Sequence, residues 1–89
     1  MKITFQVSLY PIAQKDFKPP IDNFIKALKD DDIDVKVHET STIGSADSSR
    51  VFDSLEKAYE SAAKLGDVVM VLTVVNGAPT KNELEKLNR

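Results

Sequence analysis

The side chains best suited to chemistry are uncharged hydrogen-bonding groups that fall in three separate segments. These residues are Gln6, Ser8 and Tyr10; Thr40, Ser41 and Thr42; and Thr73 and Asn76. Hydroxyl and amide groups can hydrogen-bond a neutral heteroaromatic ring without supplying formal charge, so the set favours recognition of a small molecule over catalysis. A solvated sheet face rich in β-forming residues would carry the same side chains, and both interpretations stay open on spacing alone.

Catalytic chemistry has weaker support in the sequence. The chain has one His and no Cys, which excludes disulfides, thiolate metal sites and cysteine nucleophiles. No strained turn surrounds any serine, and the three glycines form no phosphate-binding loop. We interpret His38 as an ordinary, partly exposed histidine, and the acidic run at positions 30–34 as a solvated turn. We therefore expect no catalytic residue, no metal and no cofactor.

Charge and hydropathy indicate which classes of partner and which cellular location to expect. The chain has twelve basic and fourteen acidic residues. It therefore lacks the excess of basic residues that nucleic-acid binding usually requires. No segment approaches the roughly 20 apolar residues that span a bilayer, and the N-terminus alternates polar and apolar residues unlike a signal peptide. We expect a cytoplasmic protein that binds neither nucleic acid nor membrane.

Four segments show the patterns of strands. Apolar residues alternate with polar ones from Ile3 to Leu9, which predicts a strand with one buried face that ends at Pro11. Residues 34–39 and 40–45 predict the two strands of a hairpin. Residues 67–75, DVVMVLTVV, are apolar on both faces, so this strand needs cover on both sides.

The helices are predicted from apolar spacing and from caps. Ile21, Phe24, Ile25 and Leu28 form one apolar stripe. A longer helix starts near an N-cap at Asp47 or Ser48 and ends at Gly66. Its predicted inward residues are Val51, Leu55, Ala58 or Tyr59, Ala62 and Leu65. Thr80 and Glu83 form a capping box that predicts a short terminal helix.

The order strand, helix, strand, strand, helix, strand predicts an α+β, ferredoxin-like βαββαβ sandwich. We expect one domain over residues 1–89, with a four-stranded antiparallel sheet and a short C-terminal helix. Both helices would cover one face of the sheet. The other face, which we call the open face, would carry Gln6, Ser8 and Tyr10. The apolar last strand indicates self-association through the sheet.

Four segments together resemble the thiamine-binding, YkoF-like family of small ferredoxin-like proteins. They are QVSLYP at Gln6–Pro11, STIG at Ser41–Gly44, VFDSLEKAYE at Val51–Glu60 and GDVVMVLTVVNGAP at Gly66–Pro79. The resemblance spans nearly the whole chain. It implies a non-catalytic protein that binds thiamine or its hydroxymethylpyrimidine portion, in dimers or tetramers built by sheet association.

The resemblance also implies a set of site residues, expected on the open face near a subunit interface. They are Gln6, Ser8, Tyr10, Ser41, Thr42, Thr73 and Asn76. Gln6, Ser41 and Thr42 would hydrogen-bond ring nitrogens or the exocyclic amine, and Tyr10 would offer an aromatic wall. Glu39 is the nearest carboxylate that could face the cationic thiazolium.

Two alternatives remain from the sequence. Ferredoxin-like dimers also host isomerases and monooxygenases, and an enzyme of that kind would need His38 or a carboxylate as its base. A regulatory oligomerisation module would instead bind protein on its sheet face and would have no small-molecule pocket.

Overall fold

The computed structural model describes residues 1–13, 15–38 and 41–77. The predicted terminal helix, with its capping box at Thr80 and Glu83, lies outside these ranges, and so do Glu39 and Thr40. No helix in the described ranges is long and apolar enough to cross a membrane.

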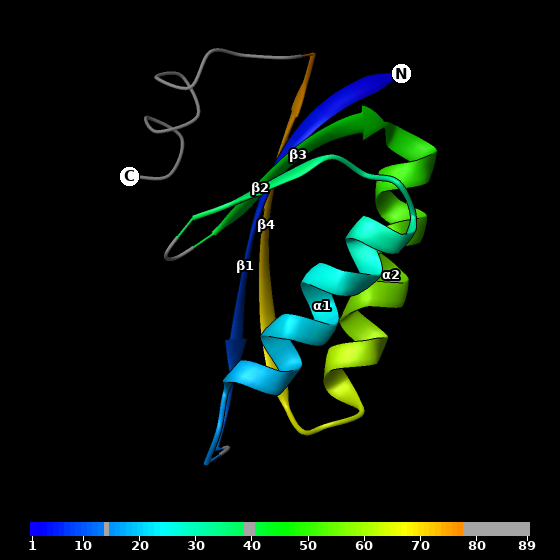
Figure 1. The fold of residues 1–89 in the computed structure, drawn as a ribbon. Coiled ribbons are helices and arrows are strands. Elements are labelled where there is room, and N and C mark those ends of the chain that lie inside the picture. Colours follow the sequence, from blue (N-terminus) through cyan, green and yellow to red (C-terminus); the bar gives the residue numbers. More distant parts are fainter. Residues whose placement is uncertain (14, 39–40, 78–89) are drawn as a thin grey trace.

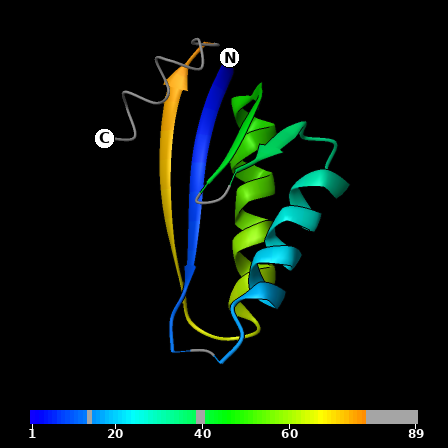
Figure 2. The ribbon, with the colours of Figure 1, turned by 60° about the vertical axis from the view of Figure 1, so that its left-hand side comes forward.

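The described chain confirms the ferredoxin-like prediction (Figure 1). Its elements are β1 (Lys2–Pro11), α1 (Lys18–Asp30), β2 (Val35–Val37), β3 (Thr42–Asp47), α2 (Ser48–Ala63) and β4 (Val68–Asn76). The strands form one antiparallel sheet in the order β2-β3-β1-β4. Figure 2 shows both described helices on the same side of this sheet, so within residues 1–13, 15–38 and 41–77 no helix covers the open face.

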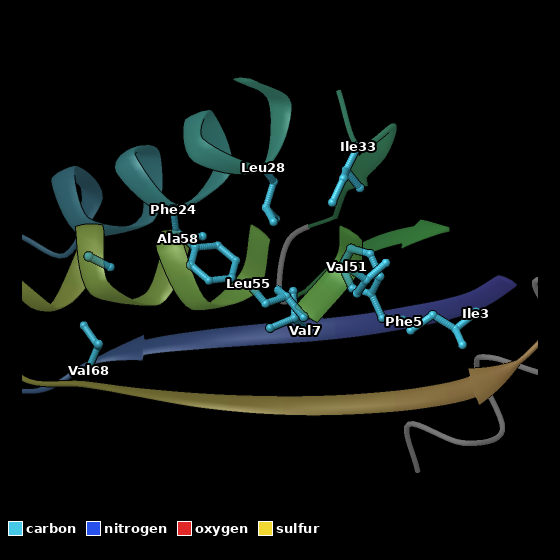
Figure 3. Packing of buried hydrophobic residues seen from close by; sticks show 11 residues of the cluster. Ile3, Phe5, Val7, Phe24, Leu28, Ile33, Val51, Leu55, Ala58 and Val68 are labelled. Carbon is cyan, nitrogen blue, oxygen red and sulfur yellow. The ribbon is translucent and has the colours of Figure 1, made fainter. Parts of the chain in front are cut away.

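The alternation in β1 places one row of its side chains in the core. Phe5 and Val7 are buried between the sheet and the helices, together with Leu28 from α1 and Leu55 from α2 (Figure 3). Cross-strand neighbours share a face, so Thr42, which lies opposite Val7, also points to the helix side.

The helix α1 forms where the apolar stripe predicts it. Pro19 and Pro20 occupy its first turn, where the missing N–H groups need no partner. The helix ends at Asp30, and Arg50 of α2 donates Nη2 to the carbonyls of Asp31 and Asp32 at 3.1 and 3.3 Å. The acidic run therefore forms the predicted turn and is joined to the second helix.

The predicted start of α2 is confirmed, whereas one predicted core residue is wrong. Asp47 is the N-cap and accepts a hydrogen bond from the Ser49 N–H. Ala58 is fully buried and Tyr59 is partly exposed. Leu65 is half exposed, because α2 stops at Ala63 and the chain turns away before β4.

The last strand, β4, lies at an edge of the sheet and is apolar on both faces. Met70 and Leu72 pack against the core on the helix side, while Val69 and Val71 are exposed on the open face. In the part of the chain that the structure describes, no helix covers these open-face valines.

Candidate functional site

The two neighbours of β1 pair with different lengths of it among the described residues, and this difference creates a notch. Pairing of β1 with β3 stops at Val7 opposite Thr42, whereas pairing of β1 with β4 continues to Pro11 opposite Val68. The last residues of β1 therefore have no strand neighbour on the hairpin side in the described part of the chain. A pocket of about 400 Å³ lies in this notch, between β1, the first turns of α1 and the β2–β3 hairpin.

The pocket walls are mostly apolar, with a few polar groups at the hairpin. The apolar lining consists of Val7, Leu9, Pro11, Phe17, Ile21, Phe24, Ile25 and Val37, and the polar lining of Tyr10, His38, Ser41 and Thr42. Apolar walls with a small number of polar groups, in a volume of this size, are typical of small-molecule sites.

Burial distinguishes the inner end of the pocket from its mouth. Phe24 and Thr42 are buried, so they lie at the inner end. Phe17, Tyr10 and His38 are exposed and border the opening to solvent. A flat ring entering here would meet aromatic side chains at the mouth and a hydroxyl group inside.

Three of the predicted site residues border the pocket: Tyr10, Ser41 and Thr42. Thr42 lies on the helix face, across the sheet from the open face where the sequence analysis expected it. The reason is the register of β3, because Thr42 pairs with Val7, which points into the core.

Three other predicted residues lie on the open face and outside the pocket lining. Gln6 pairs with Thr73, and Ser8 follows on the same face, opposite Val71. Gln6 is buried, and its Nε2 donates a hydrogen bond to Ser41 Oγ at 3.1 Å. This bond connects the open-face group to the hairpin that borders the pocket.

Asn76 stands apart from the other predicted residues. It pairs with Ile3, whereas Tyr10 pairs with Val69 at the other end of the sheet. Seven residues of strand separate these two positions, a distance of roughly 23 Å. One small ligand cannot contact both Asn76 and Tyr10.

Sequence reasoning missed the contribution of α1 to the pocket. Ile21, Phe24 and Ile25 were assigned to the core stripe, which is correct for Phe24 but leaves out their shared role as a pocket wall. Phe17 offered a signal, since it is a large aromatic residue before the stripe begins. His38 is exposed as expected, yet it also borders the pocket.

The described lining residues include no carboxylate, and Tyr10 and His38 are its titratable side chains. Within residues 1–13, 15–38 and 41–77, no three His, Cys, Asp or Glu side chains gather closely enough to hold a metal ion. The pocket therefore offers hydrogen bonds and aromatic faces rather than a strong charge.

Fold and pocket together define a small ferredoxin-like protein with a ligand-sized pocket between its first helix and its sheet. The chain belongs to the YKOF-related family, which matches residues 2–81. No curated protein matches the sequence significantly.

Solved structures share the fold at low sequence identity. A Streptococcus pneumoniae protein is 21% identical with a TM-score of 0.82, and the match covers 100% of both chains. A domain of unknown function from Bacillus cereus is 17% identical with a TM-score of 0.77, covering 93% of this chain and 86% of the other. A Thermotoga maritima protein with a proposed role in thiamine biosynthesis or salvage is 18% identical with a TM-score of 0.77, covering 100% of both chains.

Proposed function

We propose that this chain is a non-catalytic protein that binds thiamine or its hydroxymethylpyrimidine portion in the pocket beside α1. The observation that carries the proposal is the pocket itself, whose apolar and aromatic walls end at the hydroxyl group of Thr42. The family, and the proposed thiamine role of the similar Thermotoga maritima protein, support a ligand of this class.

The chemistry of the lining favours the pyrimidine as the part held inside. A neutral heteroaromatic ring can be stacked by Phe24 and hydrogen-bonded by Thr42 without a counter-charge. The cationic thiazolium fits better at the mouth, where Phe17 and Tyr10 are exposed and can interact with a cation through their ring faces.

Calorimetric titration with thiamine and, separately, with hydroxymethylpyrimidine tests the proposal. We expect saturable binding of about one ligand per chain at micromolar affinity or tighter, corresponding to roughly −8 kcal/mol or better. Absence of heat at millimolar concentrations of both ligands would refute it.

Self-association is part of the proposal, with a second copy of the chain as the partner. The edge strand β4 is apolar except at Thr73 and Asn76, and Val69 and Val71 are exposed on the open face. An unprotected apolar edge of this kind is typically covered by another subunit. Light scattering should give the mass of a dimer or tetramer, and a monomer at micromolar concentration would contradict this part.

An enzyme remains the second candidate because His38 borders the pocket. His38→Ala distinguishes the two functions. A binding protein should keep its affinity within about threefold, since an exposed side chain at the mouth contributes little. Turnover of the ligand by the wild type that disappears in the variant would favour the enzyme.

A further inference from the structure

The proposed orientation of the ligand determines which side of its pyrimidine ring reaches the inner end of the pocket. In thiamine, the thiazolium is attached through a methylene group at C5 of the pyrimidine, and hydroxymethylpyrimidine carries its hydroxymethyl group on the same carbon. The carbon C2, which carries a methyl group, lies directly across the ring from C5. When the C5 substituent lies at the mouth beside Phe17 and Tyr10, the C2 methyl group therefore points to the inner end.

Three buried side chains border the pocket at its inner end. Val7 and Phe24 are each 2% exposed, and Thr42 is 6% exposed. Figure 3 shows Phe24 directed from α1 toward β1, the strand that carries Val7. Val7 pairs with Thr42 across β1 and β3, so these two side chains are neighbours on the helix face of the sheet. A ligand that reaches the inner end therefore meets two apolar side chains and one hydroxyl group.

Ser41 is also polar and buried among the described lining residues, but its hydroxyl group is held on the opposite face of the sheet. Its Oγ accepts a hydrogen bond from Nε2 of Gln6, an open-face residue, at 3.1 Å. Successive residues of a strand point to opposite faces, in agreement with a Thr42 side chain that faces the helices. Thr42 is therefore the polar side chain that the described residues present at the inner end.

This inner end suits an apolar substituent that lies next to a hydrogen-bond acceptor. A methyl group buried against Val7 and Phe24 gains hydrophobic free energy and needs no polar partner. The two ring nitrogens that flank C2 are acceptors, and the Thr42 hydroxyl group can donate to one of them. A carbonyl oxygen at C2 would instead lose its hydration against two apolar side chains, and a buried acceptor without a partner is costly.

We infer that Val7, Phe24 and Thr42 are the specificity-determining residues of the pocket, and that they select pyrimidines with an alkyl group at C2 and reject 2-oxopyrimidines. The rejected class includes cytosine and its derivatives, which share a flat ring and an amino group with hydroxymethylpyrimidine. The outer walls of the pocket would accept either ring, so the discrimination comes from the contact at C2. The inference rests on the proposed function and specifies which class of pyrimidine the site takes.

Calorimetric titration with hydroxymethylpyrimidine and with 5-hydroxymethylcytosine tests the inference directly. The two molecules share the amino and hydroxymethyl groups. They differ at C2, where the cytosine has a carbonyl oxygen in place of the methyl group and a hydrogen on the neighbouring ring nitrogen. We expect 5-hydroxymethylcytosine to bind at least about tenfold more weakly. Equal or tighter binding of the cytosine would overturn the inference and leave a pyrimidine-binding pocket standing, whereas no binding of either molecule would overturn both.

A second analogue, which lacks only the C2 methyl group, measures the apolar part of this contact. It keeps the amino group, the hydroxymethyl group and both ring nitrogens, so its hydrogen bonds are unchanged. We expect it to bind the wild-type protein about fourfold more weakly than hydroxymethylpyrimidine, because one buried methyl group is lost. Equal affinities would show that the methyl group is not buried at the inner end, and would overturn the inference.

Val7→Thr tests the protein side of the contact, because threonine is similar in shape to valine and adds a hydroxyl group that can donate to a C2 carbonyl oxygen. The preference for hydroxymethylpyrimidine over 5-hydroxymethylcytosine should fall about fivefold. Val71→Thr, the same substitution on the open face, is the matched control and should leave the preference unchanged. An unchanged preference in Val7→Thr would overturn the inference. If that variant does not fold, the two analogue titrations on the wild type decide.

Discussion

Gln6 donates Nε2 to Ser41 Oγ at 3.1 Å, while its own Oε1 is buried with no hydrogen-bond partner among the described residues. One end of the amide is thus satisfied and the other is not. A buried acceptor without a partner costs about 1–3 kcal/mol, at least as much as one hydrogen bond contributes. Gln6 is therefore not explained by the stability of the fold.

Gln6→Met compares the cost of the unpaired Oε1 with the contribution of the Nε2 hydrogen bond, because methionine keeps the length of the side chain and removes both polar atoms. We expect the free energy of unfolding to stay unchanged or to rise by about 1 kcal/mol, since the unpaired acceptor is lost along with the bond. Urea unfolding measures the change. A decrease of more than about 1 kcal/mol would show that the amide stabilises the fold after all.

Ser54 carries a second buried polar atom that has no hydrogen-bond partner within residues 1–13, 15–38 and 41–77. Its Oγ lies on the core-facing side of α2. Ser54→Ala should raise the free energy of unfolding by about 1 kcal/mol, because alanine removes the desolvated hydroxyl and favours the helix. Ala58→Ser, one turn further along, is the matched control and should destabilise. A loss of stability in Ser54→Ala would contradict this account.

Gly44 is required by the ring of Phe5. A Cβ at position 44 would lie 2.7 Å from Phe5 Cζ and 2.8 Å from Cε1. Gly44→Ala should therefore lower the free energy of unfolding by about 1–3 kcal/mol. Adding Phe5→Leu should remove most of the penalty of the alanine, as a double-mutant cycle would detect. Strict additivity would exclude the clash as the cause.

The lowered pKa of the Asp47 carboxyl predicts that the stability of the fold depends on pH. The hydrogen bond from Ser49 Oγ, and then the N-terminal ammonium 3.2 Å away, lower the pKa of this carboxyl. A pKa lowered in the folded state gives stability that is present above the unfolded pKa of about 3.9 and is lost as the pH falls through the folded value.

Asp47→Asn isolates the charge because asparagine is also a good N-cap. Thermal unfolding between neutral pH and pH 2 should show a shallower loss of stability in the variant than in the wild type, with the difference appearing below about pH 4. Identical profiles would mean that the Asp47 charge plays no part in acid unfolding.

The sequence was sufficient for the fold because its local signals agree with one another. The alternation in β1, the stripe of α1 and the N-cap at Asp47 each specify an element without reference to the rest of the chain. Leu65 was misplaced because helical periodicity continues past the residue at which the helix stops.

The site could be predicted only in part, because it depends on where strands stop pairing. Alternation cannot show that β3 ends opposite Val7 while β4 continues to Pro11. That difference creates the notch and turns the stripe of α1 into a pocket wall. The register of β3, in which Thr42 pairs with Val7, places Thr42 on the helix face. Asn76 shares a strand with Thr73, but the sequence does not show which end of the sheet a ligand would occupy.

The central claim, that the ligand lies beside α1 and not on the open face, is tested most directly by comparing two threonines. Thr42 lines the pocket on the helix side, and Thr73 lies on the open face opposite Gln6. In each, substitution by valine keeps the shape and removes one hydroxyl. Calorimetry with hydroxymethylpyrimidine should show about fivefold weaker binding for Thr42→Val and unchanged affinity for Thr73→Val. Weaker binding in Thr73→Val with normal affinity in Thr42→Val would contradict the claim and place the ligand on the open face.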